Sequence, residues 1–150
     1  MRIGWTTLIA ALALCSIASG ETSASRVERE LLAAVNQARG ARGLAPLRWN
    51  EALATAARGH AEMMAERGSA EHDFAGEPGL PARVKRAGAS FHWLSENVAQ
   101  GASPQSIHAQ FLKSAKHYAN ILDRDMDSIG IGAVERHRQW FVVEDLSQAR

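Results

Sequence analysis

The chain has 150 residues, of which 46% are hydrophobic and 22% are charged, and its formal net charge is +1 at pH 7. These fractions are typical of one globular domain and argue against intrinsic disorder. The basic residues form short clusters, around Arg83–Arg86 and Arg136–Arg138, but no sustained basic stripe. We therefore expect no nucleic-acid partner.

The N-terminus has the pattern of an export signal. Arg2 precedes a mostly apolar run from residue 3 to residue 14, which is shorter than the roughly 20 residues that span a bilayer as a helix. Small residues then suit cleavage before Glu21. We expect residues 1–20 to be a signal peptide, and residues 21–150 to form one secreted, extracellular or periplasmic domain without a transmembrane segment. The alternative, a buried N-terminal helix, is disfavoured by the polar residues that follow.

The only cysteine, Cys15, lies inside this predicted signal segment. The residues Leu12 to Cys15 weakly resemble the lipid-attachment box of bacterial lipoproteins, although the bulky Leu14 fits that pattern poorly. Cleavage after Gly20 would leave a mature protein without cysteine and therefore without a disulfide. Its stability would then come from core burial, and a domain of this size buries about two-thirds of its unfolded surface. Lipoprotein anchoring through Cys15 is the alternative to free secretion.

The first part of the mature chain has the pattern of two amphipathic helices. Ser25 and Glu28 have the spacing of a capping box, and Gly40 marks the end of the first helix. Asn50 stands where the N-cap of a second helix belongs, and that helix ends near Gly68. Apolar residues recur at three- and four-residue steps in the first helix. They are Val27, Leu31, Ala34, Val35 and Ala38.

The middle of the chain is predicted to be less regular. Residues 69–81 are rich in glycine and proline and indicate a loop, and a short helix is expected from Ala82 to about Ala87. Ser103 and Pro104 are a helix-start signal, with serine as the cap and proline at the first helical position.

The C-terminal part has the pattern of a β-hairpin. Two β-rich runs, residues 129–134 and 139–143, flank the polar turn 135–138. Helices followed by a hairpin indicate an α+β fold, in which helices cover a small antiparallel sheet.

Six histidines are candidates for chemistry, at positions 60, 72, 92, 108, 117 and 137. His60 shares an apolar helix face, so we expect it to be partly buried and satisfied by a backbone carbonyl. His108 and His137 are predicted to face solvent. His92 stands between two aromatic residues, where packing or stacking explains it.

Three residues have a more informative context. His72 lies in the predicted loop, where side chains can converge without helical constraints. His117 is expected close to a helix C-terminus, where the dipole favours a protonated imidazole unless a metal or an acid sets its state. Glu96 stands in an apolar stretch and needs a partner, which a histidine or a metal would supply. Spacing alone does not require the three residues to meet.

Several motifs occur together in one order: Glu-Asn-Val-Ala at 96–99, His-x-Ala-Asn-Ile-Leu at 117–122, and Ile-Gly-Ile-Gly at 129–132. With the segments 31–36, 44–49 and 141–146, they resemble the CAP superfamily of cysteine-rich secretory proteins, antigen 5 and pathogenesis-related proteins. The chain is most similar to the short, cysteine-free bacterial type, and the resemblance covers residues 27–146. It implies an α-β-α sandwich with a central antiparallel sheet between helical layers.

The resemblance also implies one open cleft. It brings together His72 from the loop, Glu96 from the start of a strand, and His117 just past a helix. Many family members carry a second acid where this chain has Ser114, so the usual set of four residues is incomplete here. Glu144 falls on the last strand and could line the same cleft.

Two imidazoles and a carboxylate could hold a divalent metal such as zinc, with water completing the tetrahedron. We expect His72 and His117 to be the metal ligands, and no cofactor to be required. An enzymatic function lacks an obvious nucleophile, because Ser95 and Ser114 lie in no nucleophile elbow.

The resemblance implies binding roles, toward sterols, fatty acids, proteins or cell-surface components. We therefore predict a monomeric, non-enzymatic secreted binding module whose ligand is a small molecule, a lipid or an envelope component. A metal-dependent hydrolase acting on peptide or envelope material is one alternative. A structural protein of the cell envelope, in which the histidine–glutamate cluster only holds loops together, is the other.

Overall fold

The computed structural model describes residues 23–149, so the predicted signal peptide and Cys15 lie outside the described residues. The elements follow in the order α1 (Ser23–Gly40), β1 (Arg48–Trp49), α2 (Glu51–Arg67), α3 (Leu80–Arg86), β2 (Phe91–Gly101), α4 (Pro104–Lys113), α5 (Ala115–Ile121), β3 (Ser128–Arg136) and β4 (Gln139–Ala149).

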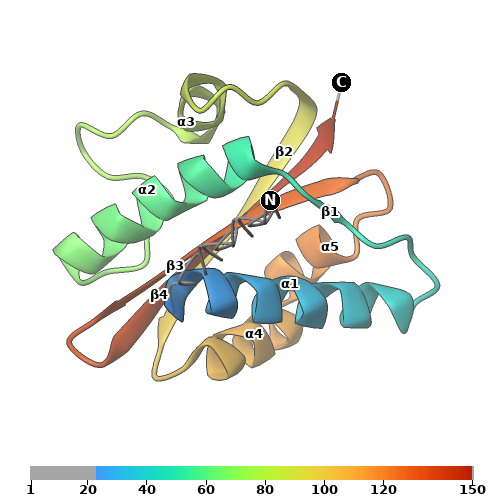
Figure 1. The fold of residues 1–150 in the computed structure, drawn as a ribbon, viewed down its shortest axis with the longest axis horizontal. Coiled ribbons are helices and arrows are strands. Elements are labelled where there is room, and N and C mark those ends of the chain that lie inside the picture. Colours follow the sequence, from blue (N-terminus) through green and yellow to red (C-terminus); the bar gives the residue numbers. More distant parts are fainter. Residues whose placement is uncertain (1–22, 150) are drawn as a thin grey trace, which may run out of the picture.

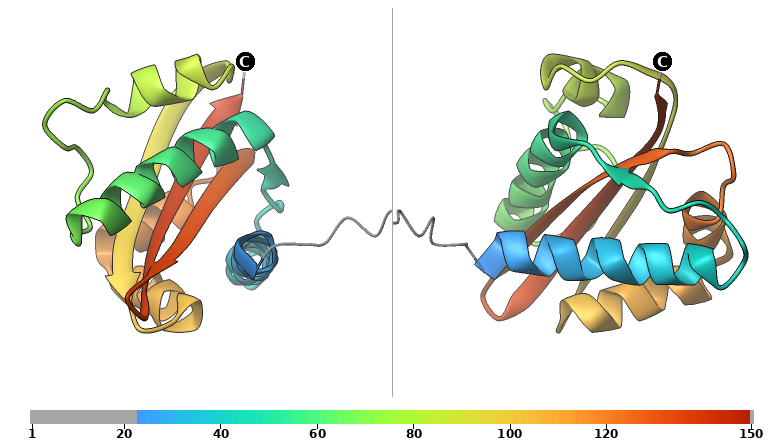
Figure 2. Two further views of the ribbon diagram at one scale, coloured as in Figure 1. Left: turned by 60° about the vertical axis from the view of Figure 1, so that its left-hand side comes forward. Right: turned by 45° about the vertical axis from the view of Figure 1, so that its right-hand side comes forward.

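The sheet lies between two helical layers, which confirms the predicted α+β sandwich (Figure 1). Its strand order is β1-β3-β4-β2, and the three long strands pair antiparallel. The two-residue strand β1 adds to this sheet in parallel beside β3. Helices α2 and α3 cover one face, and α1, α4 and α5 cover the other (Figure 2). Strand β2 is therefore an edge of the sheet with a helical layer on each side.

The termini of α2 and the start of α4 form where the capping signals predict them. The Asn50 side chain accepts from the backbone N–H groups of Ala52 and Leu53, which caps α2. Gly68 ends this helix in the left-handed region at φ 69°. Ser103 and Ser106 form a reciprocal capping box at the start of α4. These helix ends are therefore determined by residues that are close together in the sequence.

The predicted capping box at the start of the first helix is wrong. Helix α1 begins at Ser23, and Glu28 is buried with 1% of its surface exposed. Its two carboxylate oxygens accept from Nε and Nη2 of Arg58 in α2, at 2.9 and 2.7 Å. An unpaired buried carboxylate costs more free energy than a missing helix cap. Glu28 therefore pairs with Arg58 and connects the two helices.

Arg39 holds the end of α1 against the chain that follows α5. Its guanidinium is buried and donates four hydrogen bonds to backbone carbonyls. The acceptors are the carbonyl oxygens of Ala45, Ile121, Asp123 and Met126. Burial lowers the pKa of Arg39, although the charge of Asp123 opposes this effect. The bonds fix the C-terminal end of α5, the helix that carries His117.

The two faces of β3 are packed differently. Ile129 and Ile131 point to the α1 side and belong to the largest core cluster. On the other face a Cβ at Gly130 would lie 2.0 Å from the backbone nitrogen of Ala54. A Cβ at Gly132 would lie 2.4 Å from the carbonyl carbon of Ala57. Helix α2 thus lies directly on the strand backbone, and only glycine fits between them.

We expect Gly132→Ala to destabilise the domain by about 1–3 kcal/mol or more, because α2 must move away from β3 to admit the methyl group. The matched control is Gly59→Ala in α2, where a Cβ meets nothing within 4 Å. That control should be neutral or stabilising by about 0.5–1 kcal/mol, since alanine favours helix. Urea denaturation measures both variants, and equal stabilities would contradict the close approach of α2 to β3.

Candidate functional site

Glu96 lies at the centre of a buried ion-pair cluster at the edge strand β2. Only 4% of its side chain is exposed. Its Oε1 lies 2.8 Å from His72 Nδ1, and its Oε2 accepts from Arg83 Nη2. Burial raises the pKa of Glu96, but the His72 hydrogen bond and the Arg83 charge outweigh it and hold the pKa below its ordinary value. Both oxygens of this carboxylate are already engaged by the protein.

Arg83 is the partner that the sequence did not reveal. It comes from α3, and 6% of its side chain is exposed. Its Nη1 donates to the backbone carbonyls of His72 and Pro78, at 3.2 and 3.3 Å. One neighbour could have indicated that Arg83 is buried. Val84 is fully buried and places α3 against the core, whereas Lys85 and Arg86 remain exposed. Arg83 thereby ties the loop before α3 to strand β2.

His72 is held by this cluster and still faces solvent. Its side chain is 55% exposed. The hydrogen bond to Glu96 raises the pKa of His72, and burial opposes this only in part. Because Nδ1 is bonded to the carboxylate, Nε2 is the ring atom left to meet a ligand.

His117 is placed differently from the prediction. It lies inside the short helix α5, near its beginning, and α4 has already ended at Lys113. The expected effect of a helix C-terminus is therefore wrong. Burial and the charge of His72 lower the pKa of His117, so its imidazole is neutral at pH 7. The ring packs edge-on against Phe111 at 4.9 Å between centroids. The two imidazoles lie within electrostatic reach of each other.

A polar network beneath α5 positions His117. Asn97 Nδ2 donates to the Glu144 carboxylate at 3.0 Å and to the His117 carbonyl at 3.3 Å. Asn120 Nδ2 in turn donates to Asn97 Oδ1 at 2.8 Å. Both asparagines belong to the motifs that carry the family resemblance, which is the signal that could have identified them. Glu144 has no exposed surface, so it supports α5 from below.

Because side chains alternate along β2, the predicted site residues His72, Glu96 and His117 do not all lie on one face of the sheet. Glu96 and Val98 face the α2 layer, whereas Asn97 and Ala99 face the layer of α1, α4 and α5. His72 therefore reaches the edge strand from one face and His117 from the other. Ser114 joins α4 to α5, where its carbonyl accepts from the Tyr118 N–H at 2.8 Å.

Of the other four histidines, His60 and His137 agree with the prediction. His60 is fully buried, with Nε2 2.8 Å from the Glu71 carbonyl and Nδ1 2.7 Å from a Glu77 oxygen. His137 is exposed. His92 is also exposed, so the expected packing between its aromatic neighbours is wrong. His108 is half-buried and burial lowers its pKa, so the expected solvent-facing position is wrong.

The donor set limits what metal this site can hold. Across residues 23–149 no group of three or more His, Cys, Asp or Glu side chains is arranged to hold a metal ion. Both Glu96 oxygens already accept a hydrogen bond, and only 4% of this side chain is exposed, so the carboxylate is poorly placed to bind an ion. A three-ligand catalytic zinc site therefore does not fit, and the residues present fit at most a weak site of two imidazoles completed by solvent.

The model of the cysteine-rich secretory protein family, CAP, matches residues 32–146. The chain belongs to the CAP family. The protein YkwD of Bacillus subtilis is 28% identical over 123 residues, which cover 81% of this chain and 48% of YkwD. The chain thus spans about half the length of this relative.

Solved structures show the same fold. An extracellular protein of Bacillus anthracis that contains an SCP domain matches with a TM-score of 0.77 and 21% identity, over 83% of this chain and 41% of that one. An outer surface protein of Borrelia burgdorferi matches with a TM-score of 0.76 and 19% identity, over 83% of this chain and 94% of that one. A structure of NaASP2 with Zn²⁺ has a TM-score of 0.61 and 12% identity, over 85% of this chain and 82% of that one. Within the described part of the CAP chain, no helix has the length and apolar character needed to cross a bilayer.

We expect Glu96→Gln to lower the pKa of His72 toward its ordinary value, because a charge-assisted hydrogen bond is lost. Imidazole ¹H–¹⁵N NMR titration measures this change, and the backbone spectrum shows that the variant is folded. In His72→Ala the pKa of His117 should rise, since the neighbouring positive charge is removed. An unchanged His117 titration would show that the two imidazoles do not share a site.

Glu144 gives a second pH-dependent prediction. Burial raises its pKa to about 7, against the opposing hydrogen bond from Asn97. The unfolded chain loses this proton at lower pH than the folded chain, so the free energy of unfolding falls as pH rises from about 4.5 to about 7.

We therefore expect Glu144→Gln to be more stable than wild type above pH 7, by on the order of 3 kcal/mol. The difference should disappear below about pH 4.5, where the Glu144 carboxyl is protonated in the folded and in the unfolded wild-type chain. Thermal unfolding across this pH range measures it, with the exposed Glu135→Gln as the control. A stability difference of the same size at both ends of the range would refute the assignment of a raised pKa.

Proposed function

We propose that this CAP domain is a non-enzymatic binding module that acts outside the cytoplasm, and that His72 and His117 face its ligand. One observation carries the proposal. The Glu96–Arg83 pair fixes the His72 imidazole through Nδ1, yet more than half of the His72 side chain stays exposed. A preorganised, half-exposed imidazole is a recognition group that loses little freedom on binding.

The described contacts favour binding over catalysis. Covalent catalysis needs a nucleophile within hydrogen-bond reach of a base. The Ser95 hydroxyl is buried without a hydrogen-bond partner among the described residues. His117 Nδ1 is buried and likewise unbonded within that range, so no carboxylate orients this imidazole as a base. Both Glu96 oxygens are occupied.

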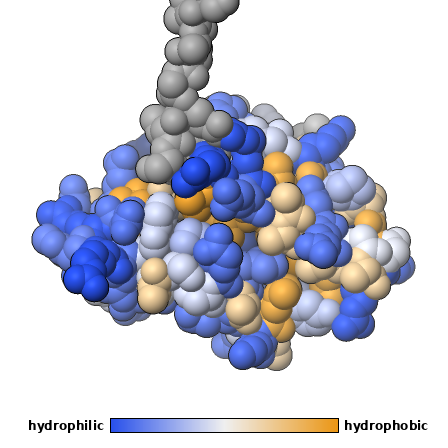
Figure 3. Space-filling model, turned by 60° about the horizontal axis from the view of Figure 1, so that its bottom comes forward, coloured by the Kyte–Doolittle hydropathy of each residue, from blue (hydrophilic) through white to orange (hydrophobic). Residues whose placement is uncertain are grey.

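Two basic side chains of the site, His72 and Lys116, favour an anionic ligand over a cationic one, while the acidic Asp73 lies beside His72. The hydrogen bond to Glu96 raises the pKa of His72 and so extends its cationic form to higher pH. Lys116, exposed on α5 beside His117, adds a second positive charge. The face of α1 and α4 is mostly hydrophilic, with hydrophobic residues in small separate patches (Figure 3). On the face that Figure 3 shows, the described residues form no broad apolar surface suited to insertion into a lipid core. Because similar folds occur in extracellular and outer-surface proteins, we propose an anionic component of the cell envelope as the ligand.

We expect the domain to co-sediment with vesicles of phosphatidylglycerol and phosphatidylcholine, and not with vesicles of phosphatidylcholine alone. A cationic side chain near an anionic membrane contributes about 1 kcal/mol, which corresponds to roughly a fivefold change in affinity. Binding should therefore be several-fold stronger at pH 6 than at pH 8, because His72 gains its charge as pH falls.

His72→Ala should remove this pH dependence, and Lys116→Ala should weaken binding at both pH values. The matched controls are His137→Ala and Lys85→Ala, which change the same residue types at exposed positions away from the site. Equal binding to both kinds of vesicle, or binding that His72→Ala leaves intact, would rule out recognition through the imidazole.

A metal-dependent hydrolase is the second candidate. It is favoured by the bond between His72 Nδ1 and Glu96, the arrangement in which a carboxylate orients a metal-binding imidazole. NaASP2, which shares the fold, was solved with Zn²⁺. Here His72 and His117 would hold the ion, which would act as a Lewis acid.

With two imidazole ligands we expect weak Zn²⁺ binding in calorimetry, reduced in the His72→Ala/His117→Ala variant and weaker at lower pH as protons compete. Tight one-site binding lost in that variant, together with turnover of a peptide, would favour the hydrolase and contradict the non-enzymatic proposal.

A further inference from the structure

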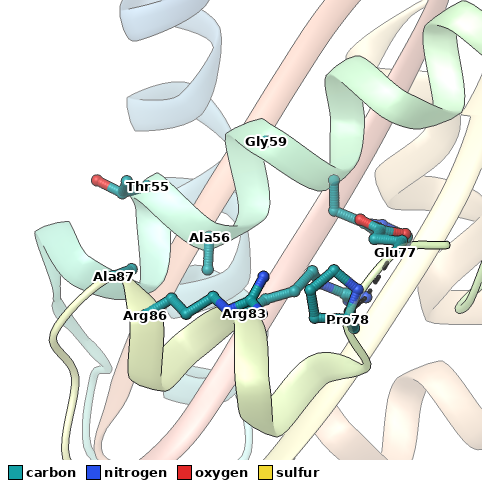
Figure 4. Close-up of a pocket in the computed structure, with 9 residues that line it drawn as sticks. Thr55, Ala56, Gly59, Glu77, Pro78, Arg83, Arg86 and Ala87 are labelled. Atoms are coloured by element: carbon teal, nitrogen blue, oxygen red, sulfur yellow. Dashed lines mark hydrogen bonds and ion pairs between the residues drawn. The ribbon is translucent and has the colours of Figure 1, made fainter.

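Residues 68–79 join α2 to α3 and present His72, although they form neither helix nor strand. Figure 4 shows Glu77 and Pro78 of this loop between the two helices. A loop without a backbone ladder depends on contacts with its neighbours to keep its shape. Arg83 of α3 supplies one such contact, to the His72 carbonyl. A second comes from His60 of α2, a fully buried residue outside the His72 site.

His60 contacts this loop on both sides of His72. Its Nε2 lies 2.8 Å from the carbonyl oxygen of Glu71, and its Nδ1 lies 2.7 Å from Oε1 of Glu77. The Phe74 ring packs on the imidazole at 5.8 Å between centroids. None of the His60 side chain is exposed, so bulk water does not compete for either ring nitrogen. The imidazole therefore joins both ends of the segment 71–77 to α2.

Both neighbours of the His60 ring nitrogens are hydrogen-bond acceptors. A backbone carbonyl carries no proton, so Nε2 must donate to Glu71. An ionised carboxylate likewise only accepts, so Nδ1 must donate to Glu77. The 2.7 Å separation is in the range of a charge-assisted hydrogen bond. An imidazole that donates from both nitrogens is an imidazolium cation, and here both of its N–H groups have an acceptor.

The charges around His60 favour this state over one in which Glu77 holds the proton. Arg83 Nη1 lies 3.8 Å from Glu77 Oε2, and its positive charge favours the ionised carboxylate. Arg83 also pairs with Glu96, so one guanidinium faces two carboxylates. Burial raises the pKa of Glu96, and the charge of His60 is among the effects that lower it. Glu77 thus lies between two cations, and a positive His60 balances the second carboxylate.

We propose that His60 is a buried imidazolium and a positioning residue, which holds the loop that presents His72 against α2. Its Nε2–H fixes the backbone directly before His72, and its Nδ1–H fixes Glu77 beyond it. Together with Arg83, which holds the His72 carbonyl from α3, it fastens the loop to both helices. The proposal does not depend on the ligand of the His72 site.

The number of protons on the ring is measured by ¹H–¹⁵N NMR of the imidazoles at pH 7. An imidazolium has two protonated nitrogens with similar ¹⁵N shifts, whereas a neutral ring has one protonated and one bare nitrogen with well-separated shifts. We expect the first pattern for His60, with both N–H protons exchanging slowly with water because the ring is buried. A bare Nδ1 in the wild-type protein would overturn the proposal.

Glu77→Gln is the informative variant, and Glu71→Gln is its matched control in the same loop. The amide that replaces the Glu77 carboxylate can donate to Nδ1, so His60 should become a neutral ring with one N–H. In Glu71→Gln only an exposed side chain changes and the carbonyl that meets His60 remains, so both N–H signals should persist. Two N–H signals in Glu77→Gln, or the loss of one in Glu71→Gln, would contradict the pairing of the second proton with Glu77.

Chymotrypsin measures how firmly the loop is held, since Phe74 lies inside it and Phe111 is fully buried in α4. Cleavage after Phe74 reports local opening, and cleavage after Phe111 reports unfolding of the whole domain. Glu77→Gln should raise the first rate relative to the second about fivefold, because a charge-assisted hydrogen bond becomes a neutral one. Glu71→Gln should leave this ratio as in wild type. An unchanged ratio in Glu77→Gln would refute the positioning role of His60.

Discussion

The buried ion pair between Glu96 and Arg83 is the interaction on which the arrangement of the site depends. Taking two charges out of water is costly, and removing either partner leaves the other uncompensated at a cost of about 3–5 kcal/mol. The pair joins three segments: the loop that carries His72, the helix α3 and the edge strand β2. In a chain whose only cysteine is Cys15, no disulfide is available to hold these segments together. Directional hydrogen bonds from one guanidinium hold them instead, and they determine the atom through which His72 meets solvent.

Arg83 can reach Glu96 because of a packing constraint elsewhere in the sheet. Helix α2 lies directly on the backbone of β3 at Gly130 and Gly132, where no side chain fits between them. α3 packs against α2 through Leu53, Ala56 and Val84, so the close approach of α2 also sets the depth of α3. Because β2 is an edge strand, its alternating side chains present Glu96 to this layer and Asn97 to the layer of α5. The site therefore lies around the edge strand β2, with His72 on one face of the sheet and His117 on the other.

The sequence predicted the features that depend on short-range chemistry. Asn50 and Ser103 cap helices through backbone N–H groups two or three residues away, so their role is visible in a short window. Ion pairs between residues far apart in the sequence could not be predicted. Glu28 has the spacing of a local cap, yet it binds Arg58, and Arg83 looks like any other residue of a basic cluster. The family resemblance correctly put Glu96 on a strand, but Glu96 lies in the middle of β2 and not at its start. It did not reveal that α4 ends before His117, or that burial and the charge of His72 lower the pKa of this imidazole.

Arg83 holds three separate parts of the chain with one side chain. Its Nη2 donates to Glu96, and its Nη1 donates to the carbonyls of His72 and Pro78. The guanidinium is rigid and planar, so these bonds place the loop carbonyls and the Glu96 carboxylate relative to one plane. Through Glu96 the same plane orients the His72 imidazole.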